Sequence, residues 1–183
     1  MTTPTGPIGP QAGVSAPAGP ALPTRRLDVV ADVYVVGAHG GAGESTVAAL
    51  NPMWWAETGH GWPLVSTSPS PRVLLVARTS ASGLRAAQAA ATQWAAGAAP
   101  PMTLLGLVLV ADAPGRFPRA LRELVRLVSG GVPRTWMLPW NEPWRLGEEI
   151  TVRGRRQPAA VLVRDVRLLS QPKPHLDGKE PLE

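Results

Sequence analysis

Residues 35–46 read Val35-Val36-Gly37-Ala38-His39-Gly40-Gly41-Ala42-Gly43-Glu44-Ser45-Thr46 and join an apolar run to a polar pair through four glycines. The apolar run, which starts at Val33, is typical of a buried strand. The glycines allow a tight backbone turn, and the Ser-Thr pair precedes more apolar residues, as in the first turn of a helix. Backbone N–H groups in such a turn favour an anion. The segment therefore predicts a strand, a cradle for a phosphate group and a helix.

Apolar runs and amphipathic stretches alternate along the rest of the chain. Strands are predicted over Asp28–Val36, Trp62–Val65, Arg72–Ala77, Thr103–Ala111 and Arg134–Leu138, and helices over Glu44–Leu50, Ser82–Gly97, Pro118–Ser129 and Ala159–Ser170. For the last of these, a strand over Val161–Val166 is the alternative. Such an order is typical of an α/β fold in three layers, a mainly parallel sheet with helices on both faces. Ligands bind such sheets at the carboxyl ends of the strands, where residues 37–43 and Asp112 fall.

The two ends of the chain differ in composition from this domain, which we place at residues 28–170. Residues 1–27 are rich in proline and glycine and carry no charged side chain before Arg25. They bury too little apolar surface to offset the entropy of ordering and are predicted to be a disordered tail. Residues 171–183 are polar and proline-rich, which predicts a flexible C-terminal tail.

Composition narrows the classes of function. The chain has no cysteine, and its histidines, His39, His60 and His175, lack the close spacing of zinc ligands. No apolar run is long enough to span a bilayer and no signal-peptide pattern is visible, which predicts a cytoplasmic protein. The formal net charge of +5 favours acidic partners, nucleic acid among them, although surface arginines that serve solubility are the alternative.

The glycine loop departs from the phosphate-binding consensus G-x-x-x-x-G-K-[ST] at its cation. Glu44 stands where the consensus lysine reaches the β- and γ-phosphates. A unit charge pair at about 4 Å is worth about 4 kcal/mol at an effective dielectric constant of 20, and here an attraction becomes a repulsion. A carboxylate in the first turn of a helix is also favourable by about 0.3–1 kcal/mol. We therefore expect Glu44 to fill the anion site from inside, unless an arginine from elsewhere in the chain or from a partner restores binding.

The loop resembles that of the ParA/MinD-type (SIMIBI-type) partitioning and positioning ATPases, K-G-G-x-G-K-[ST]-T. Residues 39–46 match this pattern at every position except the two lysines, which are His39 and Glu44 here. The resemblance implies a P-loop-type fold. It places His39 where the signature lysine crosses a dimer to the partner's nucleotide and Ser45 where a hydroxyl binds Mg²⁺. The nucleotide-binding positions that it implies are His39, Gly40, Gly41, Ala42, Gly43, Glu44, Ser45 and Thr46.

Weaker likenesses follow along the chain as far as Leu146. Arg72–Ala89 is similar to the strand and helix after the family's second switch. Leu105–Asp112, followed by Ala-Pro-Gly, resembles the strand whose end reads the base, so that Asp112 joins the implied nucleotide site; a simple turn is the alternative. Leu138-Pro139-Trp140 resembles the family's late strand end with its Pro-aromatic lip.

One element of the family is not visible in the sequence. The family has an aspartate, a ligand of the Mg²⁺ water, at the end of a strand between the loop helix and the strand that starts here at Arg72. We predict that this strand and its carboxylate are lost, because the segment from Thr46 to Arg72 is short. The chain also resembles actinobacterial proteins with the same lysine-less Gly-Ala-His-Gly-Gly-Ala-Gly loop, a group without an established activity to transfer.

Other candidate residues each have a structural alternative. His39 is either a base or a side chain bonded to the backbone. Trp94 is predicted to be core, whereas Trp140 and Trp144 fit either a partner surface or a lid. The basic residues from Arg153 to Arg156, with Arg164 and Arg167, form either a non-specific contact to DNA phosphates or a solvated surface.

These features together predict a non-catalytic pseudo-NTPase or adaptor domain that binds a protein partner or self-associates, without a cofactor. The first alternative is an atypical nucleotide-binding protein or weak ATPase that takes ATP or GTP with Mg²⁺. The second is a DNA-associated accessory factor that uses the arginine-rich segment. If the domain is an enzyme, the loop predicts an ATP hydrolase.

Overall fold

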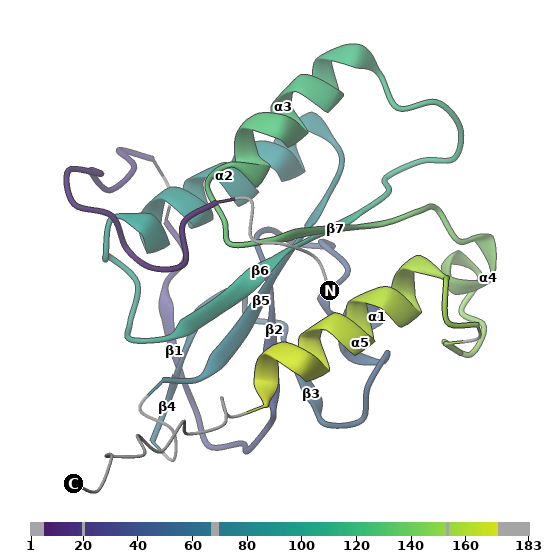
Figure 1. Cartoon of the computed structure of the whole chain (residues 1–183), viewed down its shortest axis with the longest axis horizontal. Coiled ribbons are helices and arrows are strands. Elements are labelled where there is room, and N and C mark those ends of the chain that lie inside the picture. Colours follow the sequence, from purple (N-terminus) through teal and green to yellow (C-terminus); the bar gives the residue numbers. More distant parts are fainter. Residues whose placement is uncertain (1–5, 20, 67–69, 153, 172–183) are drawn as a thin grey trace, which may run out of the picture.

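A five-stranded, all-parallel sheet forms the centre of the protein (Figure 1). The computed structural model describes residues 6–19, 21–66, 70–152 and 154–171 of the 183. The strand order is β3-β2-β5-β6-β7, with β3 at Trp54–Glu57, β2 at Val33–Gly37, β5 at Arg72–Arg78, β6 at Thr103–Val110 and β7 at Thr135–Leu138. All five residues of β2 are buried, as expected for a strand covered on both faces.

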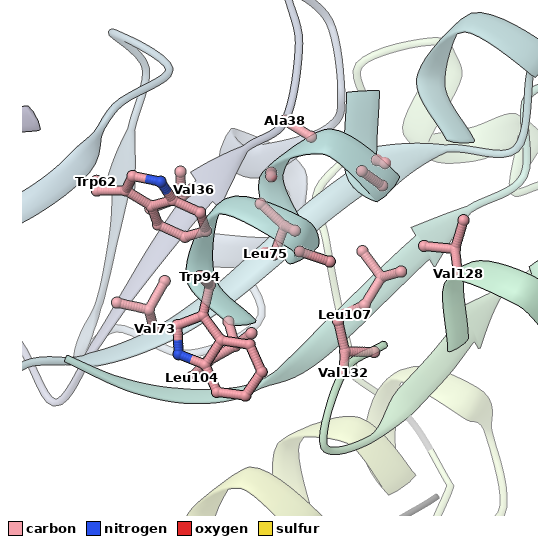
Figure 2. Packing of buried hydrophobic residues seen from close by; sticks show 14 of the residues in the cluster. Val36, Ala38, Trp62, Val73, Leu75, Trp94, Leu104, Leu107, Val128 and Val132 are labelled. Carbon is pink, nitrogen blue, oxygen red and sulfur yellow. The ribbon is translucent and has the colours of Figure 1, made fainter. Parts of the chain in front are cut away.

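Helices pack against both faces of this sheet. Helices α2 (Ala81–Ala95) and α3 (Arg119–Ser129) cover one face, and α1 (Glu44–Ala48) and α5 (Pro158–Ser170) cover the other. Successive strand residues point to opposite faces, so Val36 packs under α2 while Val35 packs towards α1 and α5. Figure 2 shows the α2 side, where Trp62 and Trp94 lie among the valines and leucines of the strands.

The predicted α/β class and the parallel sheet are confirmed. Each predicted strand and helix is present, and residues 158–170 are helical rather than extended. The first strand begins only at Val33 and not at Asp28, whereas the other elements lie within about two residues of their predicted bounds. Three short elements were not predicted: β1 (Thr24–Leu27), β3 and α4 (Glu142–Arg145). Strand β1 pairs with β4 (Trp62–Val65) in a separate two-stranded parallel sheet.

Strand β3 corrects one prediction. The segment between the loop helix and β5 does contain a strand beside β2, and it ends in a buried carboxylate, Glu57. The chain turns into it tightly, because the Asn51 side chain accepts the N–H of Met53 at 2.9 Å and the Asn51 carbonyl accepts that of Trp54 at 3.0 Å. The prediction that this segment lacks a strand ending in a carboxylate is therefore wrong.

The N-terminal segment packs against the domain where the sequence predicts disorder. The N–H of Gln11 donates to the carbonyl of Ala95 at 2.7 Å, and residues 24–27 form β1. The side chain of Gln93 holds the backbone of Leu22 through two hydrogen bonds of 3.0 Å. A few backbone bonds to a fixed surface thus order a segment with little apolar surface of its own. Residues 1–5 and 20, and the predicted C-terminal tail beyond Gln171, lie outside the described residues.

We expect Gln93→Ala to lower the free energy of unfolding by about 2 kcal/mol, because a buried donor would lose its acceptor. In the native chain Gln93 Oε1 also accepts the indole N–H of the fully buried Trp62 at 2.8 Å. Urea unfolding measures the effect. Gln88→Ala, on the exposed side of the same helix, is the matched control and should change stability by less than about 0.5 kcal/mol. Equal effects of the two substitutions would contradict this role of Gln93.

Candidate functional site

The glycine loop, residues 38–43, lies at the carboxyl edge of the sheet between β2 and α1. Two of its glycines have left-handed backbone conformations, with φ of 73° at Gly41 and 102° at Gly43, which side chains rarely adopt. The N–H of Ala42 donates to the carbonyl of His39 at 3.2 Å and closes a turn within the loop. The loop is therefore shaped by its glycines and by one internal hydrogen bond.

The side chain of Glu44 turns inward, beneath the loop. Its Oε2 accepts the N–H of Gly43 at 3.0 Å, and the residue is only 7% exposed. Its Oε1 lies 3.8 Å from Nδ1 of His60, a buried nitrogen with no hydrogen-bond partner among the described residues. A Cβ added at Gly37 would lie 2.8 Å from Glu44 Oε2. The carboxylate thus occupies the space over the end of β2 and uses one of the loop's N–H donors.

His39 is hydrogen-bonded to the backbone. Of the two roles given above for this residue, a base or a side chain bonded to the backbone, the structure shows the second. Its Nε2 accepts the N–H of Arg78 at 3.1 Å, and its Nδ1 lies 2.9 Å from the carbonyl of Gly40. Because Nε2 is an acceptor here, the proton is on Nδ1, which donates to Gly40. A Cβ added at Gly83, in the first turn of α2, would lie 2.8 Å from Nε2. The imidazole therefore joins the loop to the end of β5 and the start of α2.

Arg78 is a functional candidate that the sequence analysis missed. It is the last residue of β5, and its guanidinium donates from Nε to the carbonyl of Gly41 at 3.2 Å and from Nη1 to that of Ala111 at 3.0 Å. A cation therefore lies across the loop although both lysines of the motif are absent. The sequence does contain a signal for Arg78. This residue is the first charged one after a buried apolar run, and the run ends at the carboxyl edge of the sheet.

Two adjoining hollows open at this edge. The larger, of about 370 Å³, is lined by His39, Gly40, Gly41, Arg78, Ser80, Ser82, Asp112, Trp140 and Arg145. The smaller, of about 180 Å³, shares Arg78, Trp140 and Arg145 with it and adds Thr46 and Trp144. Together they form a cleft, which we call the arginine cleft. The structure thus gathers His39, Gly40, Gly41, Thr46 and Asp112 of the predicted site around one opening.

The other predicted positions do not line the arginine cleft. Ala42 and the side chain of Glu44 are buried, and Gly43 lies under the guanidinium of Arg78. Ser45, the implied Mg²⁺ ligand, is exposed outside both hollows. The carboxylate next to it in sequence, Glu44, is bonded to Gly43, so the residues here do not fit a Mg²⁺ site of their own. Among the described residues, no three His, Asp or Glu side chains are grouped so that they could hold a metal ion.

Asp112 begins a turn and also lines the cleft. Its N–H donates to Thr79 Oγ1 at 3.0 Å, and Gly115, which ends this turn, has a φ of 92°. Its side chain is exposed to the larger hollow. The turn and the ligand-edge position, given above as alternatives, are therefore compatible in this structure.

Helix α4 brings Trp144 and Arg145 to the cleft. The side chain of Asn141 caps this helix by accepting the N–H of Trp144 at 3.1 Å, and Pro143 occupies its first turn. Sequence reasoning missed α4 because the helix is only four residues long, although an asparagine followed by a proline is a helix-start signal. Trp140, just before it, donates its indole N–H to Glu142 at 2.6 Å.

The remaining candidates lie elsewhere. Trp94 is buried in the core, as predicted. In the arginine-rich segment, Arg155 and Arg156 are exposed, and Arg153 lies outside the described residues. Arg164 pairs with the buried Asp165 at 3.3 Å. No helix in the part of the chain described here has the length and apolar character needed to cross a bilayer.

The chain belongs to a family of unknown function (DUF6668), whose family model matches residues 31–160. The match runs from the residues before β2 into the start of α5 and so includes the glycine loop and every residue of the arginine cleft. No curated protein and no solved structure matches the chain.

Gly83→Ala should destabilise the protein by about 2 kcal/mol, the usual cost of forcing a methyl group into a filled site. The new Cβ would lie 2.5 Å from the carbonyl oxygen of Arg78 and 2.8 Å from His39 Nε2. Thermal unfolding measures the loss. Gly131→Ala is the control, because the nearest atom to its Cβ would be at 3.5 Å, an ordinary contact. If Gly83→Ala is as stable as Gly131→Ala, the close contact of His39 with α2 is not a constraint.

Proposed function

We propose that this member of the family is a non-catalytic P-loop-type domain, related to the partitioning ATPases, that acts by binding a partner and does not hydrolyse a nucleotide. The observation that carries the proposal is the 3.0 Å hydrogen bond from the Gly43 N–H to the buried Glu44 carboxylate. It places an internal anion where the phosphate chain of a nucleotide needs a free N–H donor and a lysine.

The cost of displacing this carboxylate argues against triphosphate binding in the loop. A hydrogen bond to a charged group is worth about 1.5–3 kcal/mol, and a carboxylate buried next to a phosphate adds repulsion. The N–H of Ala42 is also used, by the carbonyl of His39. Each loss of about 1.4 kcal/mol weakens binding tenfold, so a triphosphate in the loop would bind several powers of ten more weakly than in a lysine-bearing loop.

The arrangement of the elements supports the P-loop-type assignment. The loop joins a central parallel strand to a helix on one face, and the neighbouring strand β5 leads into α2 on the other face. Such strand–loop–helix units are how P-loop domains present their loops at the carboxyl edge. The resemblance of residues 39–46 to the partitioning ATPases agrees with this arrangement.

The edge of the arginine cleft supplies a surface for a protein partner or a second copy of the chain. Trp140 and Trp144 are half-buried there, and Met137, which lines the neighbouring hollow with Trp140, is 42% exposed. Aromatic residues and methionine are enriched where protein surfaces meet. The domain would then act as an adaptor that keeps the frame of an ATPase without its reaction.

ATP or GTP with Mg²⁺ should leave the midpoint of thermal unfolding of the native chain unchanged, because the loop N–H donors that a phosphate would need are already bonded within the protein. Glu44→Lys, which restores the cation, should gain Mg²⁺-dependent stabilisation at millimolar nucleotide. Glu44→Gln, which removes the charge without adding a cation, is the control and should not gain it. Mg²⁺-dependent stabilisation of the native chain by several degrees, or steady release of phosphate from ATP, would overturn the proposal.

A further inference from the structure

We propose that the arginine cleft binds a phosphate monoester, whose phosphate lies between the guanidiniums of Arg78 and Arg145 and whose apolar group fills the neighbouring hollow beside Phe117 and Met137. This inference goes beyond the proposed function, because it needs neither the N–H donors of the glycine loop nor a triphosphate. It rests on the charges of two side chains and on the lining of two hollows.

Among the residues that the structure describes, no ion pair neutralises the positive charge in the cleft. Arg78 donates to two backbone carbonyls, which leaves three of the five N–H groups of its guanidinium for a ligand. In the described part of the chain, the side chain of Arg145 makes no hydrogen bond or ion pair. Both residues line the hollows of about 370 and 180 Å³, so both lie at the same opening.

A phosphate monoester fits this pair better than a carboxylate or a longer polyphosphate. Guanidinium groups donate in a planar fork, and the three terminal oxygens of a phosphate can accept from two forks at once. A carboxylate has two oxygens in one plane and matches a single fork. Asp112 lines the same hollow and repels additional negative charge, which disfavours a chain of phosphates.

The next hollow has the character of a site for an apolar group. It measures about 610 Å³, its lining is mainly apolar, and it includes Phe117, Leu121, Met137 and Pro139. It shares Asp112 and Trp140 with the larger hollow of the arginine cleft, so one ligand can extend from one into the other. Its volume is in the usual range for small-molecule sites, about 300–1,000 Å³.

Phenyl phosphate, which joins a phosphate to an apolar ring, is the probe for this site. We expect it to bind the full chain saturably without Mg²⁺, as measured by calorimetry and by a change in tryptophan fluorescence that is lost in Trp140→Phe. Inorganic phosphate and phenol should each bind at least about tenfold more weakly, because each fills only one of the two hollows.

Arg145→Gln should weaken phenyl phosphate at least about tenfold, the loss expected for one charge-assisted hydrogen bond. Arg145 is exposed, so the variant should unfold at the native midpoint, which shows that the fold is intact. Arg126→Gln, an exposed arginine on the outer side of α3, is the matched control and should bind as the native chain does.

Phenyl phosphate that does not bind, or that binds Arg145→Gln and Arg126→Gln equally, overturns the inference. The outcome is separable from that of the proposed function. Mg²⁺-dependent ATP binding that persists in Arg145→Gln would overturn the proposed function alone. If Arg145→Gln loses phenyl phosphate binding and the native chain does not respond to ATP, both the inference and the proposed function are supported.

Discussion

Parallel alignment of the strands is the constraint on which this molecule depends. Because β2, β5, β6 and β7 all run in one direction, their carboxyl ends reach one edge of the sheet. Four segments far apart in the sequence, near residues 39–41, 78–82, 111–112 and 139–145, meet there around one opening. Arg78 ties three of them together, since its guanidinium extends from its own strand to the carbonyls of Gly41 and Ala111. The parallel topology thus brings these segments together, and particular side chains such as Arg78 then link them.

Within that edge, the charges are arranged in the opposite sense to a lysine-bearing phosphate loop. There, the cation belongs to the loop helix and the anion is the ligand. Here the loop helix contributes a buried carboxylate, which accepts a loop N–H, and the cations come from β5 and α4. A guanidinium at the rim keeps its charge available to solvent and ligands. Two N–H groups of the loop, those of Ala42 and Gly43, are thus bonded from within, and the cations lie outward at the cleft.

The sequence predicts the larger part of this architecture. Long apolar strands and the amphipathic helices α2, α3 and α5 are found where periodicity places them, because burial of a continuous apolar face determines them locally. Strands β1 and β3 depend on pairing with other segments of the chain, so local pattern does not reveal them, and α4 is too short for its periodicity to show. Arg78 could have been found from its place at a strand end. The inward turn of Glu44 and the arrival of Arg145 could not, since the first depends on the space over Gly37 and the second on α4.

The two positions that depart from the partitioning-ATPase motif share a physical feature. Each substituted side chain lies against a glycine outside the turn itself: Glu44 against Gly37, and His39 against Gly83. A Cβ at Gly37 would lie 2.8 Å from the carboxylate, whereas one at Gly83 would lie 2.8 Å from the imidazole and still closer, 2.5 Å, to the carbonyl oxygen of Arg78. A loop that had merely lost its lysines would not need this space, because a shorter or disordered side chain would serve as well. At Gly37 the surrounding chain instead accommodates this carboxylate closely, which argues that Glu44 is a packed part of the loop's structure.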